Sequence, residues 1–148
     1  MNPLPNIMKK QIVVPVDDSE NAQRALDFAI EQANILQAKL FVIHVQPRLQ
    51  TPNVKRFFST EEIEEYSLEL GASVLAQYDD KLNQSGVEFE KLIRIGSAKQ
   101  EIADFSKDIR AYCIIMGSRG HGPIKGTVLG SVSYGVVHAA PCPVTIVP

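Results

Sequence analysis

Short apolar runs alternate with amphipathic segments along this chain, and the alternation predicts an α/β fold. In the amphipathic segments, apolar residues recur every three or four positions, as on the buried face of a helix. Strands that alternate with helices favour an open, mainly parallel sheet with helices on both faces. We expect five strands, over 11–16, 40–45, 87–95, 112–116 and 143–147, and helices after the cap residues 17–19 and over 59–86, 97–109 and 131–139.

Helix boundaries carry their own signals. Ser59 with Glu62, and Ser97 with Gln100, have the spacing of a capping box, which predicts a helix start at each serine. The segment before Ser59, over 47–58, is predicted to be a long connection. The helix that follows should place on one buried side Ile63, Tyr66, Leu70, Val74, Tyr78 and Leu82, with Gly86 ending it.

Prolines restrict where two strands can lie. Pro141, Pro143 and Pro148 surround the last apolar run, which predicts a strand at the edge of the sheet. Pro15 lies within the first run, which reads as a buried strand. We therefore expect it at the last paired residue, where the backbone begins to face a ligand crevice.

Composition limits the function classes. A length of 148 residues fits one domain, predicted to span 1–148 with a loose lead-in over 1–9. The net charge of −2 disfavours nucleic acid and membrane surfaces as main partners. Without a membrane-length apolar run or a secretory signal, we expect a cytoplasmic protein. Cys113 and Cys142 lack CxxC or metal-ligand spacing, which favours reduced, buried thiols.

A glycine-rich stretch over 117–131 follows the fourth predicted strand and enters a helix. Open parallel sheets bind ligands outside the carboxyl ends of their strands. Glycines let a backbone approach phosphate oxygens, and a helix N-terminus attracts anions. Ser131, Arg119 and Lys125 add a hydroxyl and two positive charges, so the stretch predicts an anion site. It has neither the Walker A pattern nor a GxSxG elbow, and a purely local turn is the alternative.

Five motifs occur in an order and spacing that resemble the universal stress protein family, from about residue 9 to residue 148. They are the opening Ile12-Val-Val-Pro-Val-Asp-Asp-Ser-Glu, the strand end His44-Val45, Ile115-Met-Gly-Ser, Gly117-x2-Gly120-x9-Gly130-Ser131, and Pro143-Val-Thr-Ile-Val. The resemblance implies a Rossmann-like sheet of order 3-2-1-4-5. The complete glycine spacing is similar to the ATP-binding branch, whose members are homodimers.

The resemblance also implies roles for individual residues. Pro15, Val16, Asp17 and Val45 would line the adenosine pocket, with the Val45 backbone bonded to the adenine edge. Met116 and Gly117 would lie near the ribose. The residues around the phosphates would be Arg119, Gly120, Gly130, Ser131 and Val132. A divalent ion, Mg²⁺ or Mn²⁺, would be held by the nucleotide and water rather than by a protein metal site.

The function expected from the sequence is that of an ATP-binding, homodimeric regulator in a stress response, paired through the C-terminal edge strand. No catalytic residue is expected, because no strong base, nucleophile or carboxylate pair converges on the loop; slow ATP hydrolysis is the most we expect. Two alternatives stay open: a nucleotide hydrolase or adenylyl-transferring enzyme, and a nucleotide-free dimeric scaffold. Asp17 could instead be a helix cap, while His44 and His138 are expected to be structural. The downstream partner is not identified by the sequence.

Overall fold

Five parallel strands form one sheet in the order β3-β2-β1-β4-β5, which confirms the expected α/β fold and strand order. The computed structural model describes residues 8–119 and 129–148, so most of the expected lead-in and Gly120 lie outside the described residues. The elements are β1 (Gln11–Pro15), α1 (Glu20–Leu36), β2 (Lys39–Gln46), α2 (Pro52–Phe57), α3 (Thr60–Ala76), α4 (Asp79–Gln84), β3 (Phe89–Ile95), α5 (Ala98–Asp108), β4 (Cys113–Gly117), α6 (Ser131–Ala139) and β5 (Val144–Val147).

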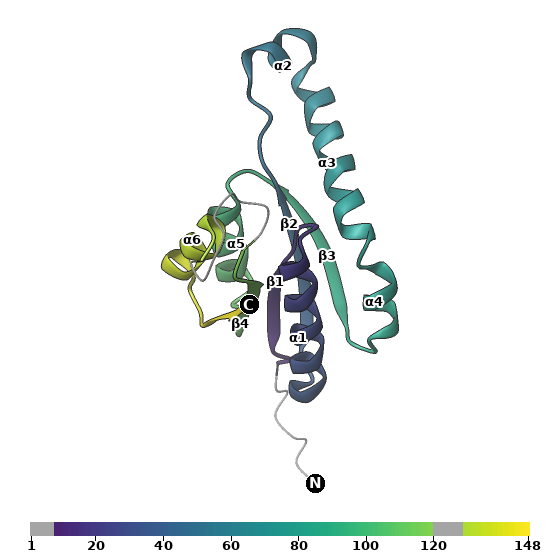
Figure 1. Ribbon diagram of the computed structural model, residues 1–148, viewed down its shortest axis with the longest axis vertical. Helices are drawn as coiled ribbons and strands as arrows, with labels where there is room; N and C mark the ends of the chain where they lie inside the picture. Colours follow the sequence, from purple (N-terminus) through teal and green to yellow (C-terminus); the bar gives the residue numbers. More distant parts are fainter. Residues whose placement is uncertain (1–7, 120–128) are drawn as a thin grey trace.

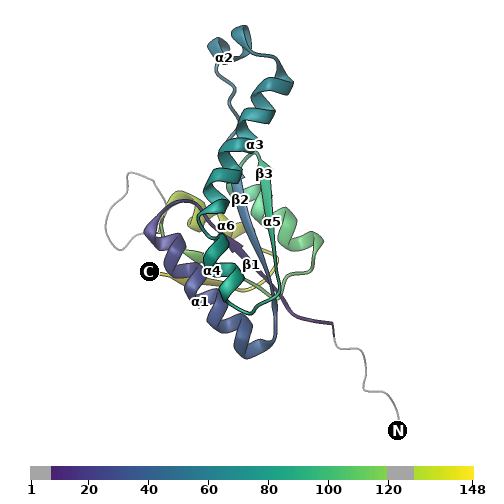
Figure 2. The same ribbon diagram turned by 90° about the vertical axis from the view of Figure 1, so that its right-hand side faces the viewer.

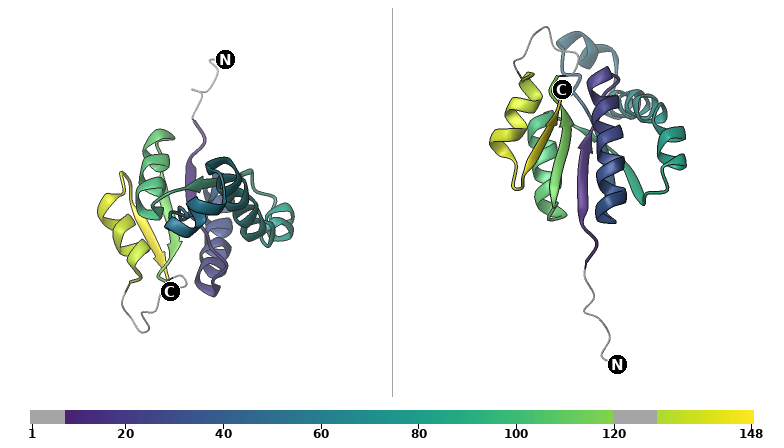
Figure 3. Two further views of the ribbon diagram at one scale, coloured as in Figure 1. Left: turned by 90° about the horizontal axis from the view of Figure 1, so that it is seen from above. Right: turned by 60° about the horizontal axis from the view of Figure 1, so that its bottom comes forward.

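Helices cover both faces of the sheet (Figures 2 and 3). On one face, α1, α3 and α4 pack over the strands, and the core contains the small residues Ala22, Ala29 and Ala33 of α1. On the other face, α5 and α6 pack around Ile102 and Val136. The two cores need both faces of β1 and β4 to be apolar, which explains why these strands are continuous apolar runs.

Strand order places β5 at an edge, as its flanking prolines predict, and β1 in the middle of the sheet. Pro15 is the last residue of β1 and pairs in register with Ile43. The backbone N–H of the next residue, Val16, still donates to the Ile43 carbonyl at 2.9 Å. The proline therefore lies where β1 leaves the sheet.

The predicted buried side of the helix over 59–86 is partly wrong. Tyr66 and Leu70 are 55% and 36% exposed, and the buried residues of α3 are Ser67, Gly71 and Leu75. Small residues are needed on this side because α3 approaches β3 closely. A Cβ at Gly71 would lie only 2.8 Å from Ile93 Cγ2.

Two other local predictions also need correction. The helix over 59–86 is two helices, because the chain turns at 77–78 between α3 and α4. The connection over 47–58 contains α2, which has proline at its first position and the Thr51 hydroxyl as its cap.

The two predicted capping boxes had opposite outcomes. The box at Ser59 is confirmed, with two reciprocal hydrogen bonds of 3.1 Å to Glu62. At Ser97 no side-chain cap forms, since the Gln100 amide donates to Asp104 instead.

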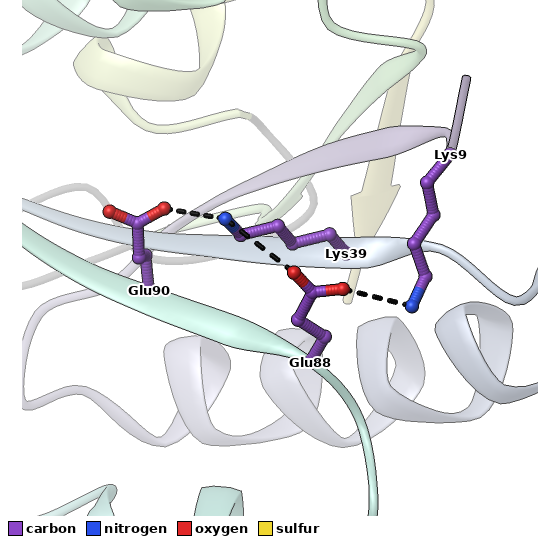
Figure 4. A network of polar contacts seen from close by, with 4 residues as sticks. All are labelled: Lys9, Lys39, Glu88 and Glu90. Atoms are coloured by element: carbon purple, nitrogen blue, oxygen red, sulfur yellow. Dashed lines mark hydrogen bonds and ion pairs between the residues drawn. The ribbon is translucent and has the colours of Figure 1, made fainter.

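Ion pairs join the amino ends of β1, β2 and β3 (Figure 4). Lys39 lies 2.6 Å from Glu90 and 3.8 Å from Glu88, and Glu88 also pairs with Lys9 at 3.0 Å. The hydrogen bond and charge of Lys9 lower the pKa of Glu88. Exposed pairs of this kind contribute little stability, so this end of the sheet needs no functional explanation.

Neither cysteine is suited to nucleophilic chemistry. Cys113 and Cys142 are free, half-buried thiols. Burial raises the pKa of Cys113 to about 11 and also raises that of Cys142. Both therefore stay protonated at neutral pH. Among the described residues, no helix is both long and apolar enough to span a bilayer.

Candidate functional site

A cavity of about 210 Å³ lies at the carboxyl ends of β1, β2 and β4, where the strand order reverses. The first turns of α1, α5 and α6 also border it. Ten of the eleven residues predicted from the sequence line this cavity, and the eleventh, Gly120, is outside the described residues. The ten are Pro15, Val16, Asp17, Val45, Met116, Gly117, Arg119, Gly130, Ser131 and Val132.

Side chains from two other elements hold the turn between β1 and α1. The His44 Nδ1–H donates to the Val16 carbonyl at 2.8 Å, and the Tyr78 hydroxyl donates to the Asp17 carbonyl. Tyr78 is fully buried, and this burial, with Asp17 nearby, raises the pKa of its phenol, so it stays a donor. The other His44 nitrogen lies 2.6 Å from Gln46 Oε1, which confirms a structural histidine.

Asp17 does not cap α1. That position belongs to Ser19, whose hydroxyl accepts from the Ala22 N–H at 3.2 Å. Asp17 Oδ1 accepts from the Ser19 N–H at 2.9 Å and so stabilises the turn just before the helix. The carboxylate thus has a local partner and also borders the cavity.

The backbone groups of Val45 point to the side of β2 where β1 lies, beyond the point at which β1 ends. In a parallel ladder, successive residues direct their N–H and C=O groups to alternate sides. Ile43 bonds toward β1 through its carbonyl, and Gln46 bonds toward β3 by accepting from Gly96 at 2.9 Å. Val45 therefore points to the β1 side, where Val16 already accepts from His44. Within the described residues, the N–H donor and the C=O acceptor of Val45 are therefore left directed at the cavity.

The two described ends of the glycine-rich segment meet at Ser118. Its carbonyl accepts from the Gly130 N–H and from the Ser133 hydroxyl, both at 2.8 Å. Its hydroxyl accepts from the Asn21 amide at 2.9 Å, and its N–H donates to Val147. The base of the segment is thus tied to α1, α6 and β5.

The N-terminus of α6 suits an anion. Gly130 is the N-cap and supplies no side-chain hydrogen bond to the first N–H groups, and the first turn of the helix lines the cavity. Free N–H groups and the helix dipole attract negative charge. Arg119 adds the only lysine or arginine side chain among the described lining residues.

Sequence reasoning missed seven lining residues as site residues. His44 and Ile43 share a strand end with Val45, and Ser19 and Ala22 share a helix start with Asp17, so the same signals could have found them. Ala98 and Ile102 are one turn apart on α5, whose start was predicted without a role. The seven are Ser19, Ala22, Ile43, His44, Ala98, Ile102 and Ser133.

The described part of the cavity suits ligand binding better than acid–base catalysis, because its titratable side chains are already hydrogen-bonded. Its only carboxylate is Asp17 and its only imidazole is His44, and both have hydrogen-bond partners. No group of three or more His, Cys, Asp or Glu residues in the described ranges could hold a metal ion.

Comparison with known proteins identifies the family of this chain. The model of the universal stress protein family matches residues 8–148, nearly the whole chain. The chain belongs to the universal stress protein family. It is 31% identical over 147 residues to universal stress protein YxiE of Bacillus subtilis, covering 95% of this chain and 99% of the relative.

Solved universal stress protein structures share the fold. UspA from Lactobacillus plantarum superposes with a TM-score of 0.73 at 27% identity, covering 97% of this chain and all of that one. The protein from Archaeoglobus fulgidus in complex with dAMP gives a TM-score of 0.68 at 25% identity, covering 96% and 99%.

Proposed function

We propose that this universal stress protein binds ATP in the cavity at the carboxyl edge of its sheet and acts in the cytoplasm as a nucleotide-dependent regulator of a stress response. The observation that carries the proposal is the convergence of ten sequence-predicted residues around one cavity. The related Archaeoglobus fulgidus protein, solved with dAMP, supports an adenine nucleotide as the ligand.

The cavity offers a group for each part of the nucleotide. The Val45 N–H and C=O suit the adenine edge, which presents one acceptor beside one donor. Met116 and Gly117, at the end of β4, line the cavity, and we assign the ribose to them. Arg119, Gly130, Ser131 and Val132 suit the phosphates. Mg²⁺ or Mn²⁺ would be held by phosphate oxygens and water.

Selectivity for adenine tests this assignment. ATP should bind about tenfold or more tightly than GTP, because guanine reverses the donor and acceptor at this edge and leaves buried groups unpaired, at about 1–3 kcal/mol. Isothermal titration calorimetry measures both affinities. Equal affinities would remove the adenine assignment and leave the phosphate assignment standing. Mass spectrometry of the supernatant from freshly purified, denatured protein should also show adenine nucleotide, which a nucleotide-free scaffold would lack.

We also propose that two copies pair through β5. Alternation along the strand directs the backbone groups of Val144 and Ile146 away from β4, because Pro143 and Val147 accept from it. An open apolar edge favours pairing with a second copy, and a two-fold axis satisfies both edges. On the neighbouring helix α6, Val132, Tyr134 and Val137 are 40%, 59% and 46% exposed.

Light scattering at tens of micromolar should therefore give the mass of a dimer. Ile146→Pro removes one outward-facing N–H without removing a bond to β4, and it should shift the protein toward monomer. Circular dichroism would show whether this variant keeps its fold. A monomeric mass for the parent protein would contradict the pairing.

A further inference from the structure

A second cavity, of about 690 Å³, lies at the carboxyl ends of β2 and β3. Its outer wall is an arm made of residues 47–68, which comprises the connection after β2, α2 and the first half of α3. Figure 1 shows this arm extending beyond the rest of the molecule. The inner wall comes from the end of β3 and from Glu101 of α5. A cavity of this volume is in the range of small-molecule sites.

Apolar side chains line much of this cavity. Ile63, Ile93 and Ile95 are half-buried beside it. Phe58 and Leu68 also border it, although they are 54% and 42% exposed. Exposed aromatic and aliphatic groups beside a concave surface favour a ligand with an apolar body.

Three cationic residues from three separate segments line the cavity. Arg48 comes from the connection, Lys55 from α2 and Arg94 from β3. The Arg94 guanidinium lies over the Phe105 ring at 5.6 Å, on the face of the sheet opposite to Ile93, so the cations on the Ser67 side are Arg48 and Lys55. None of the three has an ion-pair partner within the described ranges. Their charge attracts an anion.

Two carboxylates limit how much negative charge the ligand can carry. Glu64 and Glu101 line the same cavity, so the described lining residues have a net charge of only +1. For a nucleotide or another multiply charged phosphate, these carboxylates would offset much of the attraction of the cations. The balance favours a ligand with a single negative charge.

A buried hydroxyl points to a polar ligand group as well. Ser67 is 1% exposed, lines the cavity and has no hydrogen-bond partner in the described part of the chain. The other buried polar residues, Ser19, His44, Ser106 and Ser133, all have partners. In the described residues, every polar side-chain atom that is inaccessible to solvent has a hydrogen-bond partner. The Ser67 hydroxyl has none among these residues, so it must be accessible, and it opens onto the cavity that Ser67 lines. Buried polar groups usually have a hydrogen-bond partner, and a polar group of a ligand could serve as that partner here.

We propose that this cavity binds a small organic monocarboxylate with an apolar body, at a site separate from the nucleotide cavity. The carboxylate lies among Arg48, Lys55 and the Ser67 hydroxyl, and the body lies against the isoleucines of α3 and β3. Because only one negative charge is accommodated, the site discriminates against phosphates.

Octanoate is the probe, and calorimetry on the full chain is the measurement. The parent protein should bind octanoate saturably and bind neutral octanol at least about tenfold more weakly, as expected for lost charge-assisted hydrogen bonds. Arg48→Gln with Lys55→Gln should weaken octanoate about tenfold, and Ser67→Ala should weaken it severalfold. Both cations are exposed, so the fold does not depend on them.

The matched control is Lys10→Gln with Lys107→Gln, which removes the same charge from exposed positions outside the cavity and should leave octanoate binding unchanged. Saturating inorganic triphosphate should not displace octanoate. The proposal is overturned by a lack of saturable binding, by equal binding of octanol, or by unchanged binding in the Arg48/Lys55 variant. Loss of octanoate binding in folded Gly130→Val protein would also overturn it, by placing the probe in the nucleotide cavity.

Discussion

Gly130→Val is expected to abolish ATP binding while the sheet and its helices stay folded. Gly130 is the N-cap of α6 and borders the cavity where the phosphates are proposed to lie. A side chain there fills space that the phosphate oxygens need beside the helix N–H groups. The protein itself tolerates a Cβ, because its nearest neighbours would be Arg119 Cα at 3.4 Å and Ser118 O at 3.5 Å.

Calorimetry measures the loss of binding, with circular dichroism and sizing on the same samples. Gly130→Ala is the graded control: it adds the Cβ alone, keeps ordinary packing distances, and should weaken ATP without removing it. Ser131→Ala should have a smaller effect, because one neutral hydroxyl contributes about 0.5–1.5 kcal/mol net. Parent-like ATP affinity in folded Gly130→Val protein would show that this segment does not hold the phosphates.

Gly117→Ala, in contrast, should damage the fold itself. Gly117 is the last residue of β4, and a Cβ there would lie 2.9 Å from the backbone carbon and the Cβ of Asn21, in the first turn of α1. The helix would have to move away from the sheet, which also disturbs the Asn21 hydrogen bond to Ser118. Overpacking of this kind costs about 1–3 kcal/mol.

Urea denaturation should show this cost as a lower free energy of unfolding for Gly117→Ala. Gly130→Ala, with the same chemical change thirteen positions along the chain, should unfold at the parent midpoint, because its Cβ meets only ordinary contacts. If the two alanine variants unfold alike, the close approach of α1 to β4 is not a constraint on stability.

Much of the fold follows from patterns that are local in the sequence. Apolar runs predict β1, β2, β4 and β5 to within about two residues, because a buried parallel strand needs apolar side chains on both faces, and alternation of apolar and charged residues predicts β3 equally well. The Ser59 capping box forms as predicted, since both partners lie within one helical turn. Where Gln100 has a competing partner in Asp104, the same pattern fails.

The side of α3 that faces the sheet could not be predicted in the same way. Periodicity favours Tyr66 and Leu70, but the sheet is contacted through Ser67, Gly71 and Leu75. The deciding factor is the space left by Ile93, which lies 22 residues further along the chain. A helix that must approach closely buries its small residues, and this choice depends on the partner strand.

The residues of the candidate cavity could be predicted from the sequence because the topology of the sheet brings them together. Parallel strands all end at one edge, so residues that follow strand ends must gather there whatever lies between them. Pro15, Val45 and Met116 meet in this way. Ser118 and Tyr78 were missed as supports, because their hydrogen bonds to Gly130 and Asp17 depend on three-dimensional packing.

The central position of β1 has a consequence for synthesis of the chain on the ribosome. One neighbour, β2, follows β1 closely, but the other, β4, begins about a hundred residues later, where Ile12 pairs with Cys113. Chains emerge N-terminus first, so for most of translation one side of an apolar strand has no partner. Such an edge is prone to association with other chains. Nascent copies of this protein should therefore depend on chaperones until β4 is released.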